Sequence, residues 1–232
     1  MARQPRCAAA GLLHLLDLRW CADVSALFGE PELDLLRALL ATALPRHQVA
    51  LHAYALGRSR ALLLLTPQTA QGPARLVQDL GRRLAAEMRK RHGRAGPLLA
   101  GRFRSAILQA GPHLLDAMQY VEQLPAREGE SAASWRWAST AMHCGGARDE
   151  RVTDHPEYWR TGNTPFEREA RHRARLAEPL GAGVVQRLEA ALAGGWPLGD
   201  EAFLQGLAQQ LHRPLARRAP GRPRKPLKVQ CI

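Results

Sequence analysis

The sequence has no pair of cysteines at metal-ligand spacing and no apolar run long enough to cross a membrane. Its four cysteines, Cys7, Cys21, Cys144 and Cys231, lie far apart, and this pattern fits neither a zinc knuckle nor a disulfide framework. No uninterrupted apolar stretch of about 18 residues occurs, and the first residues lack the pattern of a secretory signal peptide. We therefore expect an intracellular protein in a reducing cytoplasm.

Acidic residues are scarce relative to basic ones. Lysine and arginine number 33 against 21 aspartates and glutamates, which gives a net charge of +12 and a pI near 10.8. This balance favours a polyanionic partner, with nucleic acid first and an anionic membrane second. An arginine-rich composition inherited from a high-GC genome would produce the same balance. Because 46% of the residues are hydrophobic, the chain has enough apolar material to bury a core.

The hydrophobic pattern predicts a strand–helix–strand–strand–helix–strand–helix order in the first half of the chain. The central feature is a hairpin at 49–67, whose second strand, 61–65, is continuously apolar as a buried central strand would be. We expect further strands at 8–20 and 103–110 and helices at 30–45, from 71 onward and at 112–123. This order indicates an α+β fold, a ferredoxin-like antiparallel sheet with helices on one face and the other face free for a ligand.

The remaining sequence predicts a helical extension and a basic tail. We expect a domain at 8–125, a connection and helical C-terminal extension at 126–211, and a disordered Pro/Arg-rich tail at 212–232. The clearest helices of the extension are at 184–192 and 200–211. No acidic residue follows Glu201, and seven arginines and lysines do. The tail is therefore expected to act as an electrostatic tether, and its Pro-Gly-Arg-Pro segment at 220–223 resembles an AT-hook core that lies in a narrow minor groove.

Two short patterns each allow two interpretations. His14, alone in the first apolar strand, is either an active-site residue or, more often for such a histidine, a packed core residue. Trp135 and Trp137 flank Arg136 and would either stack on unpaired bases or fix the connection onto the core. We favour packing for both.

Several short segments occur in an order that resembles one known family. In chain order they are His52-Ala53-Tyr54, LLLTP at 63–67, GRFRS at 101–105, YVE at 120–122 with Pro125 and Arg127, WRWAS at 135–139 and PGRPRK at 220–225. Together they resemble the REP-associated tyrosine transposases, members of the HUH endonuclease superfamily, over nearly the whole chain. The resemblance implies the same ferredoxin-like fold and a bacterial, cytoplasmic, nucleoid-associated protein.

The resemblance also implies a chemistry whose metal site is degenerate in this chain. The family cuts single-stranded DNA at hairpin-forming repeats with a tyrosine nucleophile and a Mg²⁺ or Mn²⁺ ion. By resemblance Tyr120 is the nucleophile, but the positions of the metal-binding His-x-His and of a later Asn hold Arg60, Leu62 and Leu124. Leucine binds no metal, so no metal cofactor is expected. An arginine can stabilise phosphoryl charge, yet the loss of all three ligands favours loss of cleavage.

We therefore predict a transposase-like DNA-binding protein that recognises single-stranded or hairpin DNA and has lost metal-dependent nicking. One alternative is an active transposase that cleaves and rejoins single-stranded DNA through Tyr120, so whether the protein is an enzyme stays open. A second alternative is an interaction scaffold or a decaying relic without a DNA partner. The expected DNA-binding residues are Arg82, Arg83, Arg89, Lys90, Arg91, Arg94, Arg102, Arg104, Arg127, Arg222, Arg224 and Lys225, the first eight forming a cluster with only Glu87 as an acidic neighbour.

Overall fold

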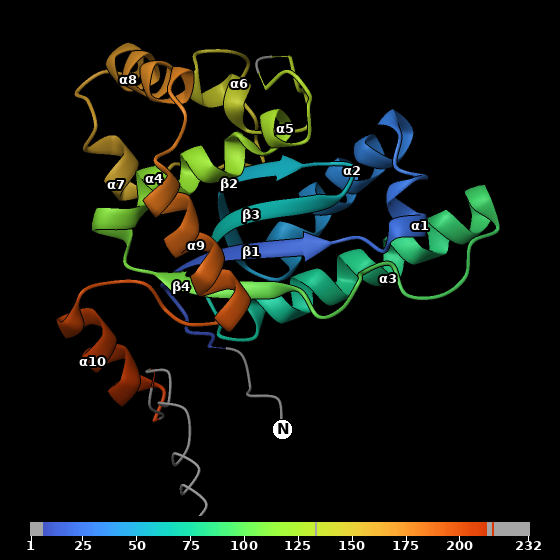
Figure 1. Cartoon of the computed structure of the whole chain (residues 1–232), viewed down its shortest axis with the longest axis horizontal. Coiled ribbons are helices and arrows are strands. Elements are labelled where there is room, and N and C mark those ends of the chain that lie inside the picture. The colour runs from blue at the N-terminus through green and yellow to red at the C-terminus, as the bar shows by residue number, and fades with distance from the viewer. Residues whose placement is uncertain (1–6, 133, 213–214, 216–232) are drawn as a thin grey trace, which may run out of the picture.

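A four-stranded antiparallel sheet forms the centre of the computed structural model, which describes residues 7–132, 134–212 and 215 (Figure 1). The strands are β1 (Leu13–Arg19), β2 (Val49–Leu56), β3 (Arg60–Pro67) and β4 (Arg104–Leu108), and their order in the sheet is β2-β3-β1-β4. The continuously apolar strand β3 lies between β2 and β1, with residues 61–65 buried. Its predicted central position is confirmed. The first strand is shorter than expected because Gly11, at φ 71°, turns the chain just before it.

Two long helices lie behind the sheet in the view of Figure 1. They are α2 (Glu30–Arg46) and α3 (Gly72–His92), while the short α1 (Ala22–Ser25) precedes them. The amphipathic spacing of α3 buries Leu76, Leu80, Leu84 and Met88, as its sequence predicts. We expected Pro45 to end the preceding helix, but it lies within the last turn of α2, which continues through Arg46.

The opposite face of the sheet is also covered, so the expectation of helices on one face only is wrong. Helix α4 (Ala110–Glu122) packs against β1, β2 and β3, and α9 (Ala182–Gly194) packs against β1 and β4. Figure 1 shows α9 crossing in front of the strands, on the side away from α2. The apolar surface of the amphipathic α9, which includes buried Leu188 and Leu192, needs a partner, and this face of the sheet provides it.

The segment after α4 runs along the outer edge of β2. It begins with α5 (Leu124–Arg127) and includes α6 (Thr140–His143) and α7 (Pro156–Trp159). The backbone N–H of Leu56 donates to the carbonyl of Trp137 at 2.9 Å, and the N–H of Ser139 donates to the carbonyl of Tyr54 at 2.9 Å. The connection therefore satisfies backbone groups that an edge strand would leave exposed.

Two further helices complete the described part of the chain. They are α8 (Pro165–Ala177), which contacts α4 and α6, and α10 (Glu201–Gln210), which follows α9. The predicted helices of the extension are thus present, with bounds that differ by one or two residues. Within the described residues, no helix is long and apolar enough to cross a membrane.

Candidate nucleic-acid interface

Tyr120 lies on α4 with its side chain fully buried, at 0% relative exposure. Its hydroxyl donates to Glu189 Oε1 of α9 at 3.4 Å, and the Arg127 guanidinium lies over its ring at 4.3 Å from the centroid. Burial raises the pKa of the phenol, and the nearby Arg60 and Arg127 oppose this shift only in part. The hydroxyl is therefore covered by α9, and its burial disfavours the phenolate form.

The sheet face beneath Tyr120 carries a small charged network. Asp17 is buried, at 1% relative exposure, and stands opposite Leu62 on β3 and Arg104 on β4. Arg19 donates from Nε to Asp17 Oδ2 at 2.8 Å, and Arg60 Nη1 lies 3.8 Å from the same oxygen. The hydrogen bond to Asp17 raises the pKa of Arg19. The charge of Arg60 is thus partly balanced by Asp17, which reduces what it can offer a phosphate group.

The residues at the expected metal-ligand positions do not fit a divalent metal ion. Leu62 and Leu124 are both fully buried and belong to the main hydrophobic core. Neither side chain has a ligand atom, and Arg60 is cationic, whereas Mg²⁺ and Mn²⁺ need oxygen or nitrogen ligands. Tyr120 and Arg60 lie close enough to interact electrostatically, so the structure does bring these two positions together.

A pocket of about 240 Å³ opens beside this network. It is lined by Asp17, Arg19, Arg102, Arg104 and the backbone around Gly101. Arg102 and Arg104 are exposed, and their side chains form no ion pair or hydrogen bond with any residue that the structure describes. Asp17 Oδ1 is buried and also has no hydrogen-bond partner there. Three guanidinium groups therefore line one small pocket, an arrangement suited to a phosphate group.

The other predicted DNA-binding arginines do not form the unpaired cluster that we expected. Acidic residues distant in the sequence pair with two of them, since Arg94 lies 2.7 Å from Asp23 and Arg91 lies 3.6 Å from Glu32. Lys90 pairs with Glu87 at 2.8 Å.

Arg82 and Arg83 of α3 also contact other side chains. Arg82 lies 3.6 Å from Asp79, and Arg83 donates to Thr42 Oγ1 at 2.7 Å. Of the α3 residues, only Arg89 among those predicted to bind DNA has no such contact with the described part of the chain. In the view of Figure 1, α3 lies behind the sheet and α9 lies in front of it. Arg222, Arg224 and Lys225 lie outside the described residues.

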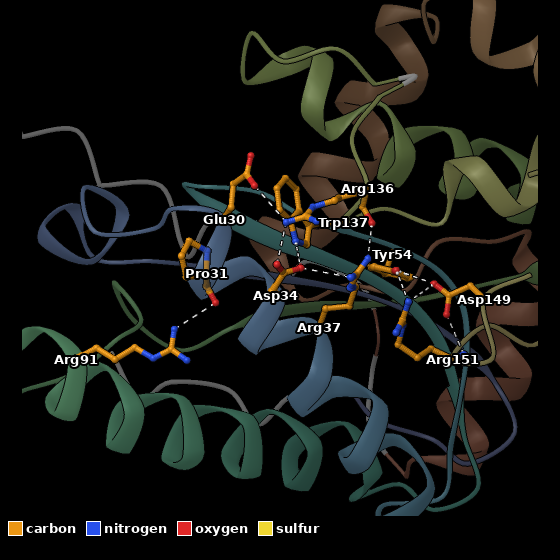
Figure 2. A network of polar contacts seen from close by, with 10 residues as sticks. All are labelled: Glu30, Pro31, Asp34, Arg37, Tyr54, Arg91, Arg136, Trp137, Asp149 and Arg151. Atoms are coloured by element: carbon orange, nitrogen blue, oxygen red, sulfur yellow. Dashed lines mark hydrogen bonds and ion pairs between the residues drawn. The ribbon is translucent and has the colours of Figure 1, made fainter. Parts of the chain in front are cut away.

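The Trp135-Arg136-Trp137 segment packs onto the core. Both tryptophans are buried, and the Trp135 indole donates to the carbonyl of Leu56 at 2.9 Å. Figure 2 shows Trp137 and Arg136 directed at Asp34 of α2, which accepts from the indole at 2.9 Å and from the guanidinium at 2.8 Å. Because the indole rings are buried against the core, they are not free to stack on bases. The packing interpretation is therefore confirmed.

His14 and His52 are also structural. Burial lowers the pKa of each to about 4, so both are neutral near pH 7. His52 lies at an irregularity in the pairing of β2 with β3, and its two ring nitrogens contact the Thr153 carbonyl at 2.7 Å and Thr66 Oγ1 at 2.9 Å. The histidine therefore links the edge of the sheet to the connection.

A buried cluster that the sequence analysis missed lies two residues beyond Tyr120. Glu122 is fully buried, its Oε1 lies 2.5 Å from His143 Nδ1, and its Oε2 lies 2.6 Å from His172 Nε2. Ser139 also donates to Oε1 at 2.5 Å. These separations are those of short charge-assisted hydrogen bonds.

The cluster shifts the pKa values of Glu122 and His143. Although burial opposes the shift, His143 and His172 hold the pKa of Glu122 far below its usual range. Burial alone would lower the pKa of His143, but the negative charge of Glu122 outweighs burial and raises it. The glutamate thus joins α4 to α6 and α8 through charged hydrogen bonds.

Comparisons with known proteins find a similar fold among solved structures. No protein-family model matches the sequence, and no curated protein matches it significantly. Among solved structures, a REP-associated tyrosine transposase bound to a REP hairpin is similar, with a TM-score of 0.50 and 12% sequence identity over 68% of this chain and 96% of that one. At this identity the likeness concerns the fold. The chain is therefore a distant structural relative of a tyrosine transposase, with the mixed helical and antiparallel-sheet architecture described above.

Proposed function

We propose that this protein binds DNA as a transposase-like protein, that its DNA is single-stranded or a hairpin, and that it no longer nicks DNA with a metal ion. The observation that carries the proposal is the pocket in which Arg19, Arg102 and Arg104 outnumber the single carboxylate of Asp17. Two of its three guanidinium groups are exposed and without a partner among the described residues, in a protein of net charge +12. Phosphate groups are the ligands that such a site favours, because guanidinium binds them through paired hydrogen bonds.

The fold supports the same proposal. A distant structural relative has a REP hairpin bound, and we propose that the sheet with its strand–helix–strand–strand–helix–strand order is of the ferredoxin-like kind used by that relative. Loss of nicking is supported by Leu62 and Leu124, which offer no metal ligand, and by the covered hydroxyl of Tyr120.

The test is a comparison of two charge-matched double variants. Arg102→Ala with Arg104→Ala removes the unpaired arginines of the pocket. Arg46→Ala with Arg75→Ala removes the same charge from exposed sites on α2 and α3. Fluorescence anisotropy with a labelled DNA hairpin is measured from low to high salt for the wild type and both variants.

We expect the pocket variant to bind at least several-fold more weakly and the control to bind nearly as well as the wild type. Each phosphate contact contributes about 0.7 to the slope of log affinity against log salt in a single strand and about 0.9 in a duplex stem, so losing two should reduce the slope by about 1.4 to 1.8. Equal weakening in both variants would show that only net charge matters. A wild-type affinity that does not change with salt would contradict the proposed DNA function.

A further inference from the structure

A second cavity, of about 490 Å³, lies beside α6, α7 and the start of α8. None of the residues that we predicted to bind DNA lines it. Its walls include the buried His143, the aromatic Tyr158 and Trp159, and the arginines Arg148 and Arg168. Two acidic residues, Glu150 and Glu169, also line it, together with Asp154. The cavity is therefore mixed in charge, with an aromatic wall.

Buried polar atoms at this cavity lack partners. His143 Nε2, Asp154 Oδ1 and Arg168 Nε form no hydrogen bond with any residue that the structure describes. His143 Nε2 and Asp154 Oδ1 lie 4.0 Å apart, which is too long for a direct hydrogen bond. Because unsatisfied buried polar groups are costly, this pair indicates a position where a polar ligand group fits between or against them.

The two atoms have complementary roles. Glu122 accepts from Nδ1 of His143 and fixes the ring, which leaves Nε2 directed at the cavity. Glu122 also raises the pKa of His143 against the effect of burial, which favours a proton on Nε2 and therefore a donor at that atom. Asp154 Oδ1 is an acceptor. A hydrogen-bond donor and an acceptor thus lie side by side.

The cavity also has an exposed aromatic surface. Trp159 is 61% exposed, and Phe166, next to the cavity residue Pro165, is 82% exposed. The Trp159 indole donates to Asp154 Oδ2 at 3.2 Å, so the ring is held in place although most of it faces solvent. Asp154 therefore positions the tryptophan with one oxygen and leaves the other oxygen unpaired.

We propose that this cavity binds one unpaired nucleobase of the DNA, stacked on Trp159 with its pairing edge against His143 and Asp154. Every base presents an adjacent donor and acceptor on that edge, and both are available only when the base is unpaired. Arg148, which is exposed and has no partner among the described residues, and Arg168 supply positive charge for the adjoining phosphates. This inference rests on the proposed DNA function and adds a reason for single-strand selectivity.

The experiment uses the fluorescence of Trp159 in the full-length chain. The protein has 5 tryptophans, so the difference between the wild type and Trp159→Phe isolates the signal from position 159. The probes are an unstructured single-stranded oligonucleotide and a fully paired duplex of the same length, and binding itself is followed separately by anisotropy of a label on the DNA. Trp196→Phe, which changes a half-buried tryptophan of a different pocket, is the matched control.

We expect the single strand, but not the duplex, to quench the signal from Trp159. Base–aromatic stacking contributes enough that Trp159→Ala should weaken single-strand binding roughly 5- to 100-fold, with duplex binding unchanged. Asp154→Asn, which keeps an acceptor for the indole, should also weaken single-strand binding. If the wild type binds the single strand but the Trp159 signal is not quenched and Trp159→Ala binds as tightly, the base-binding cavity is overturned and the proposed function is left intact. Failure of the wild type to bind the single strand would overturn the base-binding cavity, and failure to bind the labelled hairpin as well would overturn the proposed function.

Discussion

The buried carboxylate of Glu122 offers the sharpest test of how the helical extension is held on the core. Glu122→Gln keeps the size of the side chain but removes its charge. His143 then loses its counter-charge. In the wild type the two carboxylate oxygens accept from His143, Ser139 and His172, whereas an amide has one accepting oxygen and no negative charge. Breaking a buried charged pair from one side typically costs about 3–5 kcal/mol in unfolding free energy, and we expect a loss in this range.

The pH dependence of this loss follows from the two pKa shifts. The pKa of Glu122 is lowered in the folded protein, so its contribution is present above the unfolded pKa of about 4.3 and is lost as pH falls through the lower folded value. The pKa of His143 is raised, so its contribution is present below the unfolded pKa of about 6.5 and is lost as pH rises through the folded value. The difference between wild type and variant should therefore be greatest between about pH 4.5 and 6.5.

Urea denaturation at pH 3.5, 5.5 and 8.5 measures this difference. The control is Glu87→Gln, which removes a surface carboxylate paired with Lys90, and the unfolding free energy of this variant should stay close to that of the wild type at every pH. A loss below about 1 kcal/mol for Glu122→Gln at pH 5.5, or a loss that does not vary with pH, would show that the cluster is not a charged network.

Three further predictions concern the histidine at the sheet edge, the tyrosine and the tail. The pKa of His52 falls to about 4 on folding, so its neutral form stabilises the fold above pH 6.5. Between pH 7 and 5 the unfolding free energy of the wild type, measured with urea, should therefore fall by about 2 kcal/mol more than that of His52→Gln. Equal losses would contradict a buried neutral imidazole. Tyr120→Phe should bind a DNA hairpin as tightly as the wild type, and neither protein should form a covalent adduct with it in Mg²⁺ or Mn²⁺; an adduct seen only with the wild type would show that cleavage survives. Truncation after His212 should lower affinity for all DNA sequences alike if the tail is a tether, whereas a loss confined to A·T-rich duplex would favour the minor-groove interpretation.

Much of the fold could be predicted because its signals are local. The alternation before the hairpin turn and the apolar run after it identify β2 and β3, and the spacing of leucines identifies α2 and α3. The covering of the second sheet face by α9 could not be predicted, since an amphipathic helix late in the chain does not reveal which surface it meets. The division of the chain at about residues 125 and 212 stays a prediction.

The site was harder to predict because its contacts join distant parts of the chain. Glu122 is separated by 21 residues from His143 and by 50 from His172, so no motif spacing indicates the cluster. Arg94, in the loop after α3, pairs with Asp23 across 71 residues, and this is one reason why a charge count along α3 and that loop overestimated the free positive charge. The two positions that hold the His-x-His metal ligands in the family, by contrast, could be examined in the sequence, because residues two apart on one strand point to the same face.

The hydrogen bonds from the connection to the edge of β2 limit how this protein can associate. A second copy or a partner peptide that adds a strand to a sheet needs free backbone groups at its edge. At β2 the groups of Tyr54 and Leu56 are already bonded to Ser139 and Trp137, and the N–H of Thr153 occupies the carbonyl of Leu51 at 2.7 Å. Association by strand addition at β2 would first require peeling the buried Trp137 away from α2, so we expect partners to meet this protein through side chains rather than through its backbone.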